Sequence, residues 1–443
     1  MKKNIFIIIT LLLITACQEV DEHTLVLSNS QEKQPIIHVN KNRHLHMAEF
    51  WLKELKNPDR VLMSSSKIKK FNHFTAYTQH KITFFKDFNK KYGNSWVKES
   101  IQKSFNNIKR STQYLTDDTP VKRNFFTDIY KTLNIKALNQ KSVTTRFALT
   151  VNYTNQKIVP TDIALLKKKH QIHFDRNQNS ALDIATPIAV LHSSEDGMWH
   201  YAISPLSSGW VKDKDIAFGS KKEIEKYLNS KKFVVTTSPK NALLIKGKYH
   251  DHLRMGVRLP LVMGIDNMLM VKIPTRDEKG KLVITKATIK ASDTHQGYLK
   301  YTPRNILQQA FKFLNAPYGW GGMYGEQDCS KFLEEVYATV GIQLPRNSSS
   351  QSKVGRKQIK LKGLSEIQKI DKLNKNATVG ATILHLSGHI VLYLGEYKGV
   401  PYIIHTAWGS SHRHFALGRT AVTPLTFNNY LRQIDRSTSI LSR

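Results

Sequence analysis

Cysteine is almost absent from this chain of 443 residues, which has two: Cys17 at the end of an apolar N-terminal run, and Cys329. Two cysteines in such different surroundings do not make a disulfide scaffold. They also cannot share a metal site, and the chain has no HExxH motif. We therefore expect no metal and no cofactor, and the question becomes what the single downstream thiol does.

Acidic residues are also scarce, with 34 Asp and Glu against 67 Lys and Arg, which gives a formal net charge of +33. So basic a protein favours a polyanionic neighbour such as an anionic cell-wall polymer or lipid headgroups. Nucleic acid is the obvious rival partner. We do not expect it, because the charge is spread along the whole sequence and no nucleic-acid-binding module is visible. A generally basic proteome would explain the charge equally well.

No hydrophobic run is long enough to span a bilayer, because the apolar stretch at residues 5–14 is too short. Its basic start and small residues at the end predict an export signal over residues 1–16. The sequence Ile14-Thr15-Ala16-Cys17 resembles the bacterial lipobox, which implies lipidation of Cys17 and a membrane-anchored lipoprotein. Gln18 resembles the outer-membrane sorting pattern, so in a Gram-negative cell the protein would face the periplasm. The alternative is an ordinary signal peptide with a chance cysteine.

The remaining chain divides by its periodicity into five segments, and its length suggests about three domains. Residues 17–40 are polar and predict a tether. Apolar residues spaced three and four apart predict an N-terminal helical segment. Short alternating strands follow, and then helices precede strands, which indicates an α+β domain. The expected segments are the helical segment 41–142, a first barrel 143–222, a second barrel 228–292 and the α+β domain 295–443.

Cys329 lies at the start of a predicted helix, in the sequence "EQDCSKFLEEVY". The unpaired N–H groups and positive dipole at a helix start favour a thiolate. The backbone N–H of Cys329 is also a candidate oxyanion donor. If the protein is exported and Cys17 is acylated, Cys329 has no intramolecular partner, and such an odd cysteine is expected to be reactive.

A nucleophilic cysteine needs a base held by a third polar group, and position must select among 18 histidines. His389 begins the apolar strand "HIVLYLG", and His405 lies in the next strand, "YIIHTAW". The two predict a hairpin around Gly399. If paired residue numbers have an even sum, for instance 389 opposite 407, both imidazoles share one face and can interact. If the sum is odd, they face opposite sides and the pair fails.

The segment "APYGWGGMYGEQDCSKFLEEVYATVGIQLPRNSSSQ" resembles the nucleophile segment of the NlpC-type papain-like cell-wall cysteine peptidases, and "SGHIVLYLGEYKGVPYIIHTAWG" resembles their histidine segment. The pieces "FDRNQNSALD", "HSSEDGMWHY" and "MGVRLPLV" resemble two SH3-like barrels that accompany such peptidases. The resemblance implies that Cys329 is the nucleophile, His389 the general base and His405 the orienting residue. It departs from the family at Lys331, where glycine is usual.

The resemblance also implies a substrate: peptidoglycan stem peptides, cut between γ-D-glutamate and the diamino acid, with a free N-terminal L-alanine. Asp328 and Ser330 are then candidates to receive the ammonium group, and Tyr318 and Ser348 are candidate substrate contacts. Asp196, in a turn of the first barrel, could close the site from across the domain boundary. Each has a simpler interpretation: Asp328 as a helix cap, Tyr318 as core cover, Asp196 as a turn residue.

Two other functions remain open from the sequence. One is a non-catalytic, cell-wall-binding lipoprotein that uses the barrels as ligand sites. The other is a papain-like amidase or acyltransferase with a different substrate, because one fold can support several chemistries. The sequence sets no oligomeric state.

Overall fold

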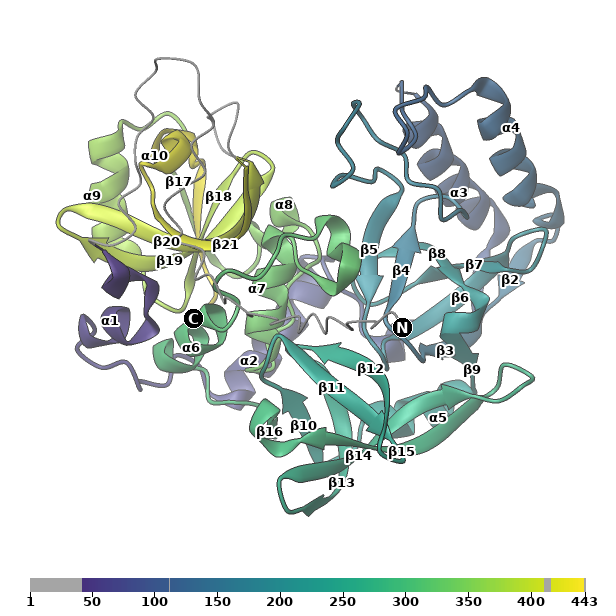
Figure 1. Cartoon of the computed structure of the whole chain (residues 1–443), viewed down its shortest axis with the longest axis horizontal. Coiled ribbons are helices and arrows are strands. Elements are labelled where there is room, and N and C mark those ends of the chain that lie inside the picture. Colours follow the sequence, from purple (N-terminus) through teal and green to yellow (C-terminus); the bar gives the residue numbers. More distant parts are fainter. Residues whose placement is uncertain (1–41, 111, 410–415, 442–443) are drawn as a thin grey trace, which may run out of the picture. The chain divides into compact units, whose positions relative to one another are not determined.

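A computed structural model describes residues 42–110, 112–409 and 416–441 of the chain (Figure 1). It confirms the predicted class: N-terminal helices, two strand-rich domains and a C-terminal α+β domain follow one another along the chain. The predicted signal peptide, the tether and Cys17 lie outside the described residues.

The N-terminal segment consists mainly of short helices, and its two halves join different cores. Trp51, on the first helix, is buried in the core of the C-terminal domain, whereas Ile101 and Ile129, further along, pack in the core of the strand-rich domains. The elements are η1 (Arg43–His46), α1 (Ala48–Lys53), α2 (Ser65–His73), η2 (Phe74–Thr78), η3 (Phe85–Asp87), β1 (Lys91–Gly93), α3 (Asn94–Lys109), α4 (Arg123–Thr132), η4 (Ile135–Ala137) and β2 (Ser142–Thr144).

The first β-domain is a seven-stranded antiparallel sheet in the order β5-β4-β8-β7-β6-β3-β9. In β3 the larger Phe147 and Leu149 alternate with Ala148 and Thr150, as the sequence pattern predicts, but all four residues are buried. They are β3 (Arg146–Thr150), β4 (Thr154–Lys157), β5 (Gln178–Leu182), β6 (Pro187–Ser193), β7 (Trp199–Ile203), β8 (Ser208–Lys212) and, after η5 (Asp213–Asp215), β9 (Ile216–Phe218).

The second β-domain is another seven-stranded sheet, in the order β12-β11-β15-β14-β13-β10-β16. The helix α5 (Lys221–Leu228) precedes it and begins with a capping box between Ser220 and Glu223. The strands are β10 (Phe233–Thr236), β11 (Lys240–Ile245), β12 (Lys248–Arg254), β13 (Arg258–Ile265), β14 (Met268–Arg276), β15 (Leu282–Lys290) and, after η6 (Ala291–Asp293), β16 (Thr294–Gln296).

The C-terminal domain packs helices on a six-stranded antiparallel sheet in the order β17-β22-β18-β19-β20-β21. Its helical elements are α6 (Pro303–Phe311), η7 (Trp320–Gly325), α7 (Cys329–Ala338), α8 (Ser348–Gln351), α9 (Glu366–Asn376), η8 (Phe427–Asn429) and α10 (Tyr430–Gln433). Its strands are β17 (Lys357–Lys360), β18 (Thr382–Leu386), β19 (His389–Tyr397), β20 (Val400–Gly409), β21 (Ala416–Pro424) and β22 (Arg436–Ser439).

The apolar stripe of α7 explains why this helix lies against the sheet. Phe332, Val336 and Tyr337 are fully buried and belong to the same core as Ile390 and Ile404 of β19 and β20. Thr302 caps α6 and Pro303 occupies its first turn, as predicted. The helix that begins with Cys329 is thereby fixed over the two strands that carry His389 and His405.

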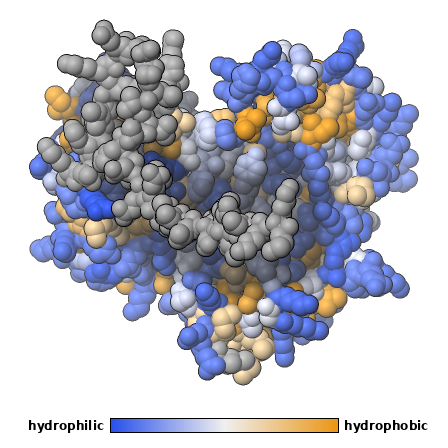
Figure 2. Space-filling model, in the orientation of Figure 1, coloured by the Kyte–Doolittle hydropathy of each residue, from blue (hydrophilic) through white to orange (hydrophobic). Residues whose placement is uncertain are grey.

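The visible surface is mostly hydrophilic, with small separate hydrophobic patches (Figure 2). This matches the excess of basic residues in the sequence. Within the part of the chain that the structure describes, no helix combines the length and apolar character needed to cross a bilayer.

Candidate active site

Cys329 is the first residue of α7, and its thiol is buried, with 9% of the residue exposed. Asp328 caps the helix by accepting a hydrogen bond from the Lys331 N–H. The Cys329 N–H is then one of the donors that a helix start leaves unpaired. The backbone N–H of Ile390 lies within hydrogen-bonding reach of the sulfur. The thiol therefore lies beside the first residues of β19, where His389 is located.

His389 and His405 form a hydrogen-bonded pair, with His389 Nε2 2.8 Å from His405 Nδ1. The register in which Leu392 pairs with Ile404 places His389 opposite Ala407, so the sum is even as the pairing hypothesis requires. His405 is fully buried, and its Nε2 lies 3.0 Å from the hydroxyl of Thr423 on β21. This chain of contacts occupies His389 Nε2, so Nδ1 is the ring nitrogen of His389 that the pair leaves over.

Burial keeps both the thiol and the imidazoles neutral. It raises the pKa of Cys329 to about 12, and the negative charge of Asp328 adds to this shift. It lowers the pKa of His389 to about 4, against the opposing effect of Asp328, and it lowers the pKa of His405 further. Desolvation thus opposes the thiolate that the helix start favours, and the directions of both pKa shifts favour a thiol and a neutral imidazole.

Asp328, which is predicted to receive a substrate ammonium group, is engaged by several donors of the protein itself. Arg346 holds it with two hydrogen bonds, of 2.8 and 3.2 Å. The Gly321 N–H and the Ser330 hydroxyl donate to the same carboxylate. Burial would raise the pKa of Asp328, but Arg346 more than offsets it and the pKa is lowered. Both oxygens thus accept hydrogen bonds and the cap interpretation holds, while the contact with a substrate ammonium group stays a prediction.

Arg346 is the main residue of this site that the sequence reasoning missed. Besides Asp328 it binds the Ser330 hydroxyl at 3.0 Å and, through Nε, the hydroxyl of Ser180 on β5 at 2.9 Å. Its position just before Ser348 in "LPRNSSSQ" was the available signal, because a buried carboxylate next to the thiol needs a cation. Thr423 was also missed.

The other predicted substrate contacts, Tyr318, Ser330 and Ser348, differ in their burial and in their hydrogen bonds. Tyr318 lies near the thiol, and burial, then Asp328 and Cys329, raises its pKa. Ser330 is buried and its hydroxyl is engaged by Asp328 and Arg346, so it supports the site. Ser348 is half-buried at the first position of α8. No group of three or more His, Cys, Asp or Glu suited to a metal ion occurs among the described residues.

Asp196 does not close the site. Its carboxylate accepts hydrogen bonds from Ser194 and Met198, within its own exposed turn between β6 and β7. The prediction was wrong because a turn aspartate satisfies its own backbone first. The first β-domain reaches the C-terminal domain through other residues: Gln178 donates to the Gly321 carbonyl at 3.1 Å, and the Tyr153 hydroxyl donates to the Gly322 carbonyl.

Aromatic side chains from both domains gather beside Tyr318. Phe174 of the first β-domain has its ring centroid 5.4 Å from that of Trp320, 5.7 Å from that of Trp408 and 6.1 Å from that of Tyr318. The His173 ring lies against that of Trp408 at a tilt of 33°, with the centroids 4.0 Å apart. This aromatic cluster (His173, Phe174, Tyr318, Trp320 and Trp408) places a loop of the first β-domain next to the residues around the thiol.

Comparisons with known proteins agree with this arrangement. Residues 315–411 match the NlpC/P60 family, and residues 165–212 match an SH3 domain of the SH3b1 type. A solved NlpC/P60 endopeptidase from Photobacterium damselae subsp. piscicida has the same fold, with a TM-score of 0.73, 21% identity, and coverage of 89% of this chain and 96% of that chain.

Two curated relatives are both called gamma-D-glutamyl-L-lysine dipeptidyl-peptidase. The protein from Bacillus subtilis is 38% identical over 58 residues, which cover 13% of this chain and 20% of the relative. The protein from Bacillus cereus is 28% identical over 194 residues, which cover 42% of this chain and 54% of the relative. The chain thus spans about a fifth and about half of their lengths. Its C-terminal domain is an NlpC/P60 domain, preceded along the chain by an SH3-like domain of the SH3b1 type.

Proposed function

We propose that this protein is a cysteine endopeptidase that hydrolyses peptidoglycan stem peptides between γ-D-glutamate and the diamino acid. The observation that carries the proposal is a hydrogen-bonded histidine pair, together with a buried thiol next to the N–H of Ile390, the residue that follows His389. The NlpC/P60 match and the activity for which the two relatives are named support a hydrolase of this class.

In the proposed reaction, Cys329 Sγ attacks the scissile carbonyl carbon while its proton moves to His389 Nδ1. His405 holds the other nitrogen of His389 and keeps the ring oriented. The N–H of Cys329 donates to the oxygen that becomes negative. His389 then gives the proton to the departing amine. A water molecule then gives a proton to His389 and attacks the carbonyl carbon of the thioester. The C–S bond breaks, the acyl part of the substrate leaves as a carboxylic acid, and His389 returns the proton to the sulfur.

The aromatic cluster supports a preference for short, free stem peptides. Phe174 and His173 place a wall of the first β-domain against Trp320 and Trp408. We expect a wall at this position to exclude a glycan-linked extension beyond the N-terminal L-alanine. We accordingly assign the free-amine preference to exclusion by these rings, in place of the ion pair with Asp196 that the sequence suggested.

The proposed location is a bacterial membrane surface, with the protein held there by a lipid on Cys17. The motif that ends at Cys17 supports it, and the charge of +33 favours an anionic surrounding. Expression of the full chain and of Cys17→Ala, followed by membrane fractionation, tests it. The wild type should sediment with membranes and the variant should not. Equal distribution of the two would contradict lipid anchoring.

The activity itself is tested by incubating the full chain with a free L-Ala-γ-D-Glu-diamino-acid tripeptide and identifying the products by mass spectrometry. Release of the L-Ala-γ-D-Glu dipeptide is expected. Inertness equal to that of Cys329→Ala would favour a binding protein. Cleavage of a different bond would favour an amidase or acyltransferase.

A further inference from the structure

Lys331 is a buried lysine that stands two residues after the thiol. Only 6% of the residue is exposed, although lysine is rarely buried without partners. Its ammonium group lies 2.7 Å from Glu334 Oε1 on the same helix and 3.6 Å from Asp183 Oδ2 of the first β-domain. We propose that Lys331 is a positioning residue that, through Asp183, fixes the first β-domain against the nucleophile helix and so sets the width of the cleft.

Asp183 is placed to transmit this contact to the cleft because it directly follows β5. The same strand supplies Gln178, which holds the Gly321 carbonyl, and Ser180, which binds Arg346. Three contacts within six residues thus fasten β5 to the loop before Cys329 and to the cation that neutralises Asp328. A displacement of Asp183 would move these contacts together, because β5 is a continuous strand.

Because Asp183 also binds Arg254, the contact between Asp183 and Lys331 can be removed without breaking the contact between the two β-domains. The Arg254 guanidinium binds Asp183 Oδ1 at 2.5 and 2.6 Å and stacks on the ring of Tyr153 at 3.4 Å. Asp183 therefore keeps a charged partner from the second β-domain when Lys331 is lost. Removal of the lysine should leave the two β-domains joined and weaken only their attachment to α7.

The neighbouring charges favour this assignment. Glu335, one turn after Lys331, is 2% exposed, and among the described residues its carboxyl oxygens have no hydrogen-bond partner. Burial raises the pKa of Glu335 well above its ordinary value, so the group is neutral. The cluster then balances two carboxylates, Asp183 and Glu334, against two cations, Lys331 and Arg254.

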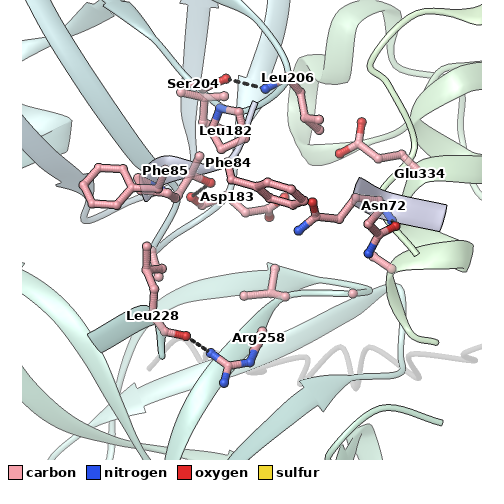
Figure 3. Close-up of a pocket in the computed structure, with 18 of the residues that line it drawn as sticks. Asn72, Phe84, Phe85, Leu182, Asp183, Ser204, Leu206, Leu228, Arg258 and Glu334 are labelled. Atoms are coloured by element: carbon pink, nitrogen blue, oxygen red, sulfur yellow. Dashed lines mark hydrogen bonds between the residues drawn. The ribbon is translucent and has the colours of Figure 1, made fainter. Parts of the chain in front are cut away.

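Asp183, Lys331, Glu334 and Glu335 line a cavity of about 950 Å³, to which α2 and the second β-domain also contribute residues. Figure 3 shows Asp183 and Glu334 on the wall of this cavity, together with Asn72 and Arg258 from those neighbouring elements. Water in such a space can reach the rim of the ion cluster. The cluster is accordingly a contact that can open without unfolding either domain.

The test compares Lys331→Met with Lys369→Met in the full chain. Lys369 is an equally buried lysine of the C-terminal domain, and it binds the carbonyls of Leu431 and Arg432, away from the β-domains. Hydrogen exchange of residues 178–183 should be faster in Lys331→Met and unchanged in Lys369→Met. Lys331→Arg, which keeps the charge, should restore protection. Equal exchange in Lys331→Met and wild type would overturn the inference.

A kinetic readout rests on the proposed function. We expect Lys331→Met to reduce the preference for a free stem tripeptide over its N-acetylated form by at least about 10-fold, since small displacements at a cleft have large kinetic effects. Lys369→Met should keep the preference. If the wild type cleaves neither peptide, the proposed function fails, while the exchange result still decides the inference. If Lys331→Met does not fold, Lys331→Gln, which removes the charge and leaves the pair of Asp183 with Arg254 in place, carries the same two expectations.

Discussion

His389 and His405 face each other because of one extra residue in their hairpin. Near the turn, Gly395 pairs with Tyr402, but beyond a bulge at Leu394 the register changes and Tyr393 pairs with Ile403. The first register, continued without the bulge, would place His389 opposite Trp408 and turn the two imidazoles to opposite faces. The bulge therefore creates the 2.8 Å contact on which the proposed chemistry depends.

Replacing His405 by Ala should lower kcat by about 10²-fold or more, in the range found for groups of acid–base machinery, because His389 loses its orienting partner. Thr423→Val should have a smaller effect in the same direction. His385→Gln is the matched control, since His385 lies in the adjacent strand and binds Asp435 at 2.8 Å. Steady-state kinetics on the tripeptide measures this. Comparable losses in His405→Ala and His385→Gln would mean that the pair has no special role.

On the acid side, kcat/KM should begin to fall only at an unusually low pH. Burial lowers the pKa of His389 to about 4, and a base accepts a proton only when it is neutral. Hence kcat/KM should stay constant from pH 7 down to about 5 and fall as the pH drops through about 4. An acid limb centred near the ordinary histidine pKa of about 6.5 would show that His389 is not buried as described.

Arg346→Met should destabilise the protein by about 3–5 kcal/mol, because it leaves the buried carboxylate of Asp328 without its cation. Arg304→Met provides the control, since Arg304 makes a similar two-contact ion pair with Asp59 on the surface. The control should leave the urea midpoint nearly unchanged. If both substitutions shift the urea midpoint by a similar small amount, Arg346 does not stabilise the site through Asp328.

Phe174→Ala should widen the end of the cleft and raise the rate on glycan-linked stem peptides relative to free ones. Ile172→Ala, two residues earlier and exposed, should not. The comparison uses chromatography of products from intact peptidoglycan and from free tripeptide. An unchanged ratio in Phe174→Ala would place the free-amine preference elsewhere.

The local parts of this site could be predicted from the sequence, and the contacts between domains could not. The helix start at Cys329 and the apolar strands of the two histidines follow from periodicity. The bulge at Leu394 has no such signal, so the register remained open. Asp196 was chosen because it is acidic and lies in a turn. Asp183 is the carboxylate that reaches α7, since domain docking places distant segments together without a local pattern.

Lys331 is a second case in which the sequence does not show a contact between domains. The sequence marked it as a departure from the usual glycine, but its meaning depends on Asp183 and Arg254, which lie 148 and 77 positions earlier in the chain. Only the packed structure brings these three charges together. A residue that breaks a local pattern is therefore a good place to look for a contact that the pattern cannot show.

The most direct test of the account is the mass of the products formed from L-Ala-γ-D-Glu-diamino-acid tripeptide by the wild type, Cys329→Ala and His389→Ala. The account predicts release of the L-Ala-γ-D-Glu dipeptide by the wild type and none by either variant. Undiminished release by Cys329→Ala would contradict it, because the sulfur would then have no part in the cleavage.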